Sequence, residues 1–413
     1  MKRFVLICLT LTVLALLLPL FASCGGGEAV TLYVYNWGEY ISDGSEGSLD
    51  SNAEFEKWYA QTHPGKRVKV NYSTFSSNED MYAKLSSGAT NYDVVVPSDY
   101  MIGRMIKEGM LRPLNFENIP LASEIDYTVM FGGDAPSYDP EKLYTVPYTY
   151  GIVGIIYNTR IVDAADVGTW ELLWNEKYAG NILQFNNSRD SFMTALCKLG
   201  YSINTDNEAE WRAALDELMR QKPLVQSYVM DEIFNKMKSG SAAIAPYYAG
   251  DFFTMYADNP DLAFSYPKEG TNVFVDAMCV PACSKNPEIA EEYINFMLTK
   301  EIAIANAEYI CYASPNRQVF TDPDYIATME EMHPDAMQIL YGTDGLDLEL
   351  YENLPEEKLM LLNDLWEELK IESPINAAII IMAGVILGGA VGAGVFFAVR
   401  GRRRRRYLDG LWD

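Results

Sequence analysis

A run of 25 residues without a charged side chain, from Ile375 to Val399, constrains this chain more than any other feature of its sequence. Roughly 20 apolar residues suffice to cross a bilayer as a helix, so the run predicts a transmembrane helix. Five arginines, Arg402 to Arg406, follow closely, and basic residues beside a span stay in the cytoplasm. We therefore expect residues 400–413 to be a basic cytoplasmic tail and the preceding chain to lie outside.

The N-terminus is a second feature that predicts export. Residues 1–23 begin with two basic side chains, continue as an apolar run from Phe4 to Leu20 and end in small residues before Cys24. This order is typical of a secretory signal peptide and resembles a bacterial lipoprotein signal, in which Cys24 becomes the lipidated first residue. Residues 24–28 are then a flexible tether. An ordinary signal, cleaved without lipid attachment, is the alternative. Both ends predict an extracytoplasmic protein, periplasmic or on the outer face of the cell membrane, anchored in membrane lipid.

The part between the two ends is large and acidic. The whole chain of 413 residues carries 32 basic and 57 acidic side chains, a formal net charge of -25. Such a field repels phosphate backbones and concentrates cations, so we expect no nucleic-acid partner and favour a cationic ligand. With 49% hydrophobic and 13% aromatic residues, the chain has the composition of a globular protein with a packed core.

Short β-rich runs alternate with amphipathic helical stretches, which predicts an α/β fold with mainly parallel sheets. The expected strands cover residues 31–35, 67–72, 93–96, 242–245 and 277–280. The expected helices cover residues 53–61, 79–86 with Asn78 as N-cap, 100–108, 208–220, 230–238, 287–307 and 350–370. About 350 residues are enough for two lobes of ordinary size.

Seven motifs occur in order along residues 30–370. They are YVYNWGEYIS (33–42), FSSNEDMYAKL (75–85), YDVVVPSDYMIGRMIKEGML (92–111), YTVPYTYGIVGIIYN (144–158), KLGYSINT (198–205), NPEIAEEYINFML (286–298) and YASPN (312–316). Together they resemble the spermidine/putrescine-binding proteins of bacterial ABC transporters. The resemblance implies a two-lobed periplasmic-binding-protein-like fold with a ligand cleft between the lobes. It assigns residues 29–145 and 276–320 to lobe 1, and residues 146–275 and 321–372 to lobe 2.

The resemblance also implies an extracytoplasmic receptor that binds putrescine, spermidine or both and delivers them to an ABC permease in the cytoplasmic membrane, without a cofactor or metal. A polyamine requires carboxylates at its ammonium groups and aromatic faces along its methylenes, because an unpaired buried ammonium costs several kcal/mol. By this resemblance and this chemistry, the expected ligand-binding residues are Trp37, Glu39, Tyr40, Ser98, Tyr100, Asn187, Asp190, Tyr248, Asp251, Phe274, Asp276 and Tyr312.

Several of these positions have a purely structural alternative. A tryptophan beside a strand end, such as Trp37, often belongs to the core, and Tyr312 suits packing between lobes. Serine or aspartate at a strand-to-helix junction is an ordinary N-cap, and we assign that role to Asp99. Asp276 has the strongest case for binding, because an aspartate between FV and AMCV is an unusual choice for a core strand unless the carboxylate has a partner.

Three positions bear on ligand length. Asn187 and Asp190 match positions that are both acidic in spermidine-binding relatives, so one carboxylate is missing here. Asp251 is a residue typical of putrescine-preferring relatives. We therefore expect putrescine to bind at least as tightly as spermidine.

Little in the sequence predicts an enzyme. His63 and His333 are the only histidines, each before a proline, and no phosphate-binding loop or nucleophile elbow occurs. The cysteines Cys197, Cys279, Cys283 and Cys311 are either free or paired in disulfides. Two alternatives to a transport receptor remain open. One is a membrane-tethered polyamine sensor, although only residues 401–413 follow Arg400, and the other is a thiol enzyme on the same fold.

Overall fold

The computed structural model describes residues 29–131, 135–343 and 345–371. The chain divides into two compact units, residues 1–359 and 360–413. In the described residues, no helix is both long and apolar enough to span a bilayer. The signal sequence, Cys24, the span expected at residues 375–399 and the basic tail all lie outside the described residues.

Ten strands form the sheet of the first unit. They are β1 (Val30–Trp37), β2 (Val68–Phe75), β3 (Val94–Val95), β4 (Thr145–Asn158), β5 (Ile182–Phe185), β6 (Val225–Val229), β7 (Ile244–Tyr248), β8 (Leu262–Ser265), β9 (Thr271–Cys279) and β10 (Leu348–Glu349). The α-helices are α2 (Ser51–Thr62), α3 (Asn78–Ser86), α4 (Asp99–Lys107), α5 (Thr128–Phe131), α6 (Ser188–Leu199), α7 (Glu208–Gln221), α8 (Glu232–Lys238), α9 (Ala249–Asp258), α10 (Pro287–Met297), α11 (Lys300–Ile310), α12 (Arg317–Phe320), α13 (Pro323–Met332), α14 (Ala336–Tyr341) and α15 (Glu356–Lys370).

The sheet is mixed, with strand order β2-β1-β3-β9-β4-β7-β5-β6. β1 runs parallel to β2 and β3, and β5 runs parallel to β6 and β7. At the centre, however, β9 and β4 are antiparallel to each other and to their neighbours β3 and β7. The prediction of mainly parallel sheets therefore holds for the outer strands and is wrong at the centre.

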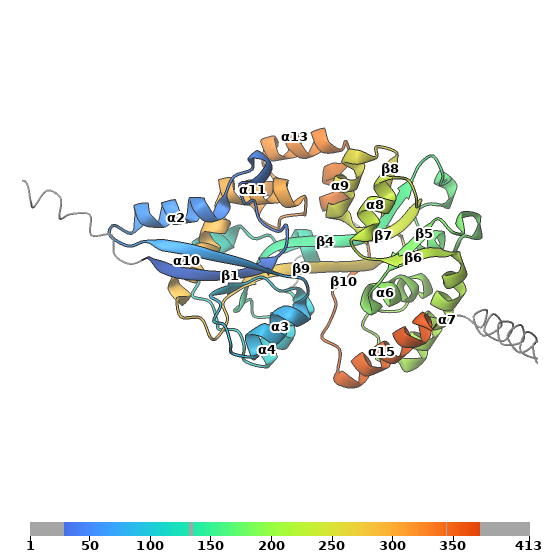
Figure 1. Ribbon diagram of the computed structural model, residues 1–413, viewed down its shortest axis with the longest axis horizontal. Coiled ribbons are helices and arrows are strands. Elements are labelled where there is room, and N and C mark those ends of the chain that lie inside the picture. The colour runs from blue at the N-terminus through green and yellow to red at the C-terminus, as the bar shows by residue number, and fades with distance from the viewer. Residues whose placement is uncertain (1–28, 132–134, 344, 372–413) are drawn as a thin grey trace, which may run out of the picture. The chain divides into compact units, whose positions relative to one another are not determined.

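Two long central strands connect the two groups of outer strands. The first half of β4 pairs with β9, from Thr145 opposite Cys279 to Ile152 opposite Val273. Its second half pairs with β7 and β8. Figure 1 shows β4 and β9 side by side, running from the blue strand β1 toward β5 and β6. They are the crossing segments that a two-lobed fold requires.

Burial explains why these strands form. All of β4 except Tyr157 is buried, and β5 is buried throughout. Helices provide the cover: α2, α10 and α11 pack together beside β2, α6 packs against β5 and β9, and α9 packs against β4, β7 and β8. Strands that are covered on both faces are nearly continuous apolar runs, as in VVV before Pro97 and GIVGII within β4.

Two local predictions are wrong. The N-cap of α3 is Ser77, whose side chain accepts the amide of Asp80, while Asn78 begins the helix and its Oδ1 accepts the amide of Ser98 at 3.1 Å. The single helix predicted over residues 287–307 is two helices, α10 and α11. Thr299 between them has an extended backbone, which interrupts the helical hydrogen bonds although neither glycine nor proline marks the break.

Several helices begin soon after a strand of this sheet. Among them, α4 follows β3, α6 follows β5 and α9 follows β7. Ligand sites of open α/β sheets lie at the carboxyl ends of strands, where the first turns of such helices meet. Ser98 immediately precedes α4, while Asp190 and Asp251 lie in the first turns of α6 and α9. The fold thus brings three segments that carry predicted ligand residues to the same kind of position.

Candidate functional site

Asp276 lies in the middle of β9, opposite Thr149 of β4, and is 4% exposed. Its Oδ1 accepts a hydrogen bond from Ser98 Oγ at 2.6 Å, and its Oδ2 accepts one from the Tyr40 hydroxyl at 2.7 Å. Burial raises the pKa of Asp276 to about 6, and the two hydroxyl donors partly oppose this shift. Within the described part of the chain, its partners are neutral hydroxyls and not a lysine or arginine.

Two further aspartates have the same kind of partner. Asp251 accepts a hydrogen bond from the Tyr312 hydroxyl at 2.9 Å, and burial raises the pKa of Asp251 to about 7. Asp190 accepts hydrogen bonds from the hydroxyls of Tyr248 and Tyr351, both at 2.8 Å. Each of these buried or half-buried carboxylates is therefore satisfied by tyrosine.

Three of these tyrosine rings form a continuous row with the ring of Phe274. Tyr40 packs edge-on to Tyr312 with centroids 5.8 Å apart, Tyr312 packs on Phe274 at 5.8 Å, and Phe274 packs on Tyr248 at 5.4 Å. Such edge-to-face pairs are the favoured aromatic geometry. We call Asp190, Asp251 and Asp276 with these four rings the acidic-aromatic cluster.

Two glycines make room for the row. Gly151 of β4 lies opposite Phe274, and a Cβ at Gly151 would lie 2.4 Å from Phe274 Cζ. A Cβ at Gly250 would lie 2.6 Å from Tyr312 Cδ2. Real Cβ atoms do not approach this closely, so both positions exclude any larger residue unless the rings move.

The cluster has the chemistry of a receptor for organic cations. A buried carboxylate is costly unless a charge or strong hydrogen bonds compensate it, and a tyrosine hydroxyl supplies only a neutral hydrogen bond. An ammonium group supplies full compensation, and aromatic faces attract cations and cover methylene groups. Three carboxylates along a row of rings match a chain-like ligand with several ammonium groups.

The buried cysteines do not have the properties of a catalytic thiol. All four described cysteines are free, and Cys197, Cys279 and Cys311 are buried while Cys283 is exposed. Burial raises the pKa of the three buried thiols, that of Cys311 to about 11. A reactive cysteine needs the opposite shift, so these three thiols give no support to the thiol-enzyme alternative.

Three predicted ligand residues have contacts outside the cluster. The Trp37 ring packs on Phe75 with centroids 4.5 Å apart. Glu39 is exposed, has a φ of 53° and lies 3.4 Å from the Tyr309 hydroxyl. The Tyr100 hydroxyl donates to Glu79 Oε1 at 2.9 Å. The structure therefore does not join Trp37, Glu39 or Tyr100 to the acidic-aromatic cluster.

The prediction that Asp99 caps α4 is wrong. Ser98 occupies the N-cap position of α4, and Asp99 lies within the helix, 1% exposed. Its carboxylate accepts the amides of Tyr100 at 2.6 Å and Val275 at 3.2 Å, and burial raises the pKa of Asp99 to about 8. Asn187 is the N-cap of α6, accepting the amide of Asp190 at 2.8 Å.

Sequence reasoning also missed three residues of the site. Thr149 Oγ1 lies 2.7 Å from the Tyr40 hydroxyl, and Tyr351 donates to Asp190. The guanidinium of Arg189 stacks over the Tyr351 ring at 4.3 Å. Arg189 was within reach of prediction, because a basic residue directly beside Asp190 is unusual in so acidic a chain. Tyr351 belongs to none of the seven motifs.

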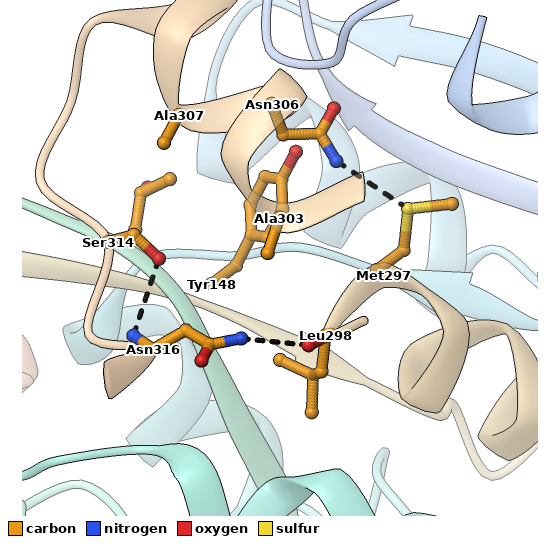
Figure 2. A pocket seen from close by; sticks show the side chains of 9 residues that line it. Tyr148, Met297, Leu298, Ala303, Asn306, Ala307, Ser314 and Asn316 are labelled. Atoms are coloured by element: carbon orange, nitrogen blue, oxygen red, sulfur yellow. Dashed lines mark hydrogen bonds between the residues drawn. The ribbon is translucent and has the colours of Figure 1, made fainter. Parts of the chain in front are cut away.

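A small cavity lies next to the cluster, and one of its lining residues is Thr149, the hydrogen-bond partner of the Tyr40 hydroxyl. It is lined by Tyr148, Thr149, Met297, Leu298, Ala303, Asn306, Ala307, Ser314 and Asn316. Figure 2 shows two hydrogen bonds of Asn316. Its side-chain Nδ2 donates to the Leu298 carbonyl at 2.9 Å, and its backbone N–H donates to Ser314 Oγ at 3.3 Å. The cavity has room for about one water molecule, which is too little for a chain-like ligand.

Residues 53–333 match the family model described as bacterial extracellular solute-binding protein. The chain is 34% identical over 332 residues to the spermidine/putrescine-binding periplasmic protein of Escherichia coli strain K12, covering 79% of this chain and 90% of that one. It is 26% identical to the putrescine/cadaverine-binding protein of Pseudomonas aeruginosa, covering 86% and 99%.

Solved structures give the same result. The substrate-binding protein of a spermidine/putrescine ABC transporter from Streptococcus pneumoniae superposes with a TM-score of 0.68 at 31% identity, covering 83% of this chain and 99% of that one. A lipoprotein of Treponema pallidum superposes with a TM-score of 0.67 at 25% identity, covering 83% and 100%. The resemblance and the two-lobed fold expected from the motifs are confirmed. With its central crossing strands and a family match over more than half its length, the chain belongs to the bacterial extracellular solute-binding proteins.

Proposed function

We propose that this chain is an extracytoplasmic receptor that binds polyamines, putrescine and spermidine among them, and delivers them to the permease of an ABC transporter. The observation that carries the proposal is the pairing of Asp190, Asp251 and Asp276 with tyrosine hydroxyls along one row of rings. The relatives are named as binding proteins for spermidine, putrescine or cadaverine, which supports the same ligand class.

The binding step is an exchange of partners. An incoming ammonium group replaces a neutral tyrosine donor at the carboxylate with a charged one, and charge-assisted hydrogen bonds are roughly twice as strong as neutral ones. The displaced hydroxyl of Tyr40 retains Thr149 Oγ1 as a partner at 2.7 Å. The rings of the row then cover the methylenes between the ammonium groups, and the burial of these methylenes stabilises the complex. Cation–π contacts with the rings help to replace the water that the ammonium groups lose.

The two ends of the row favour a diamine over a triamine. At one end, Asp276 has only two neutral donors. At the other, Asp190 accepts from the side-chain amide of Asn187 at 2.7 Å as well as from two tyrosines, and Asp190 also interacts electrostatically with the guanidinium of Arg189. An extra ammonium at that end meets a carboxylate already supplied with donors and a nearby positive charge. We therefore propose that putrescine binds at least as tightly as spermidine.

We propose membrane attachment at both ends, by a lipid on Cys24 and by a transmembrane helix over Ile375 to Val399. The support is the signal pattern and the uncharged run in the sequence. One similar structure is a lipoprotein of Treponema pallidum. We further propose that the receptor binds its ligand without turnover, since the family's description is of solute binding and the three buried thiols have raised pKa values.

A ligand panel tests the proposed function. Full-length protein in mild detergent is heated with putrescine, spermidine, amino acids, sugars or ferric iron, and its melting temperature is recorded. A ligand at 100 times its Kd stabilises the folded state by about 2.7 kcal/mol, which is a readily measured shift. We expect the polyamines alone to produce it. A shift with another class and none with polyamines would refute the proposal.

A further inference from the structure

Asp99 belongs to a short antiparallel contact between the start of α4 and β9. The carbonyl of Pro97 accepts the amide of Ala277 at 3.1 Å, and Ser98 Oγ donates to the carboxylate of Asp276. Asp99 Oδ2 then accepts the amide of Val275 at 3.2 Å. Residues 97–99 thus contact residues 275–277 of β9 in antiparallel order. The Asp99 carboxylate accepts the amide hydrogen bond that a backbone carbonyl would accept in a regular pair of strands.

This contact brings two buried acids close together. Asp99 is 1% exposed and Asp276 is 4% exposed, and burial and, to a smaller extent, the nearby Asp276 raise the pKa of Asp99. The charged or titratable groups that face Asp99 are Asp276 from β9, Arg189 from α6, Tyr100 from α4 and Tyr138 from the segment before β4. Arg189 is the one cation among them in the described residues, and its own hydrogen bonds go to Asn204 and the Glu352 carbonyl.

We propose that Asp99 and Asp276 hold one proton between them in the ligand-free protein near neutral pH, and that this proton leaves to the solvent when a ligand ammonium reaches Asp276. The inference rests on the proposed function. Two neighbouring buried carboxylates oppose each other's ionisation, so they titrate as a pair. The step breaks one carboxylic O–H bond, the proton passes to buffer, and the ammonium replaces its charge.

The titration of the two groups agrees with this reading. Burial raises the pKa of Asp99 to about 8 and that of Asp276 to about 6, so the pair retains a proton at pH 7. A nearby ammonium lowers both pKa values, because it favours the ionised form. Alkyl ammonium groups titrate near pH 10, so the ligand itself exchanges no proton at pH 7. Asp99 is thus a positioning residue that makes affinity depend on pH.

Calorimetry measures the released proton directly. Putrescine is titrated into full-length protein at pH 7 in buffers of different ionisation enthalpy, and the dependence of the heat on buffer gives the number of protons released. Asp251, whose pKa is raised to about 7, contributes to the total, so the informative quantity is the difference between wild type and Asp99→Asn. We expect that variant to release close to one proton fewer.

The pH profile provides the second readout. Between pH 6 and pH 8, we expect the slope of log affinity against pH to fall by close to one in Asp99→Asn, so that affinity changes roughly tenfold less per pH unit. A merely structural role would weaken binding by the same factor at every pH and leave the slope unchanged. The matched control is Asp93→Asn, since Asp93 is a buried acid that accepts the amides of Tyr33 and Lys285 away from the cluster.

An unchanged proton count or slope in Asp99→Asn overturns the inference. If Asp99→Asn does not fold, Asp251→Asn is measured in its place. In that variant the pair of Asp99 and Asp276 is the remaining source of released protons near the row, and we expect putrescine binding to release close to one proton. Putrescine binding to Asp251→Asn with no proton released overturns the inference as well. A failure of putrescine to bind the wild type instead refutes the proposed function, so the two failures are distinguishable.

Discussion

Replacing Asp276 by asparagine removes the charge at the centre of the site and preserves the shape of the side chain. In the wild type, both carboxylate oxygens accept hydroxyl hydrogen bonds, from Ser98 and Tyr40. The asparagine oxygen retains one of these donors. The Tyr40 hydroxyl can donate instead to Thr149 Oγ1, 2.7 Å away, and accept from the new amide. We therefore expect Asp276→Asn to fold.

The loss of affinity follows from what the ligand then finds. An ammonium group taken out of water at this position has no charged partner in Asp276→Asn. Removing one partner of a buried charge pair costs about 2 to 5 kcal/mol. At about 1.4 kcal/mol for each factor of ten, putrescine affinity falls by about 30-fold to several thousand-fold.

Calorimetric titration of wild type and variant measures this change. Tyr40→Phe is the informative comparison, because it removes only a neutral hydrogen bond, worth about 1 kcal/mol, and preserves the carboxylate. Asp93→Asn controls for the loss of a buried acid outside the cluster and should retain wild-type affinity. If Asp276→Asn binds putrescine as tightly as wild type, the ammonium group does not reach Asp276 and the assignment of the site is wrong.

Four other changes test separate parts of the account. Asn187→Asp adds a carboxylate beside Asp190 at the far end of the row, so the affinity for spermidine relative to putrescine should rise by about tenfold or more. An unchanged ratio of the two affinities in calorimetry would argue against a selectivity role for Asn187. Gly151→Ala places a methyl group against the Phe274 ring, so putrescine affinity should fall while the fold, followed by circular dichroism, survives; wild-type affinity would mean that the row tolerates displacement. Because burial raises the pKa values of Asp99, Asp251 and Asp276, the folded protein binds more protons than the unfolded chain, and the melting temperature without ligand should fall from pH 5 to pH 8; a rise would contradict the sign. Cys24→Ala should remain in the membrane fraction through the predicted span, and its release into the medium would show that the span does not anchor.

Much of the fold follows from patterns that depend on a few neighbouring residues. The strands near residues 31–35 and 67–72 are β-rich, and they occur as β1 over Val30–Trp37 and β2 over Val68–Phe75. The break between α10 and α11 was missed because no glycine or proline marks the extended backbone of Thr299. The antiparallel centre was missed because strand direction depends on how distant segments meet.

The site was predictable where burial conflicts with residue type. Asp276 was chosen because an aspartate in an apolar strand needs a partner, and the structure supplies Ser98 and Tyr40 from distant segments. The same conflict did not identify Asp99, because an aspartate at the start of a helix has an ordinary capping role that hides any other. Tyr351 contacts Asp190 across a sequence separation of 161, a pairing that a single sequence does not reveal.

The most direct test of the account is a crystal structure of the protein grown with putrescine. We predict one ligand nitrogen within hydrogen-bonding distance, about 2.7 to 3.2 Å, of the Asp276 carboxylate, the other nitrogen near Asp251 or Asp190, and the methylenes against Phe274. Putrescine bound elsewhere, with the tyrosine hydroxyls still on all three carboxylates, would contradict the central claim.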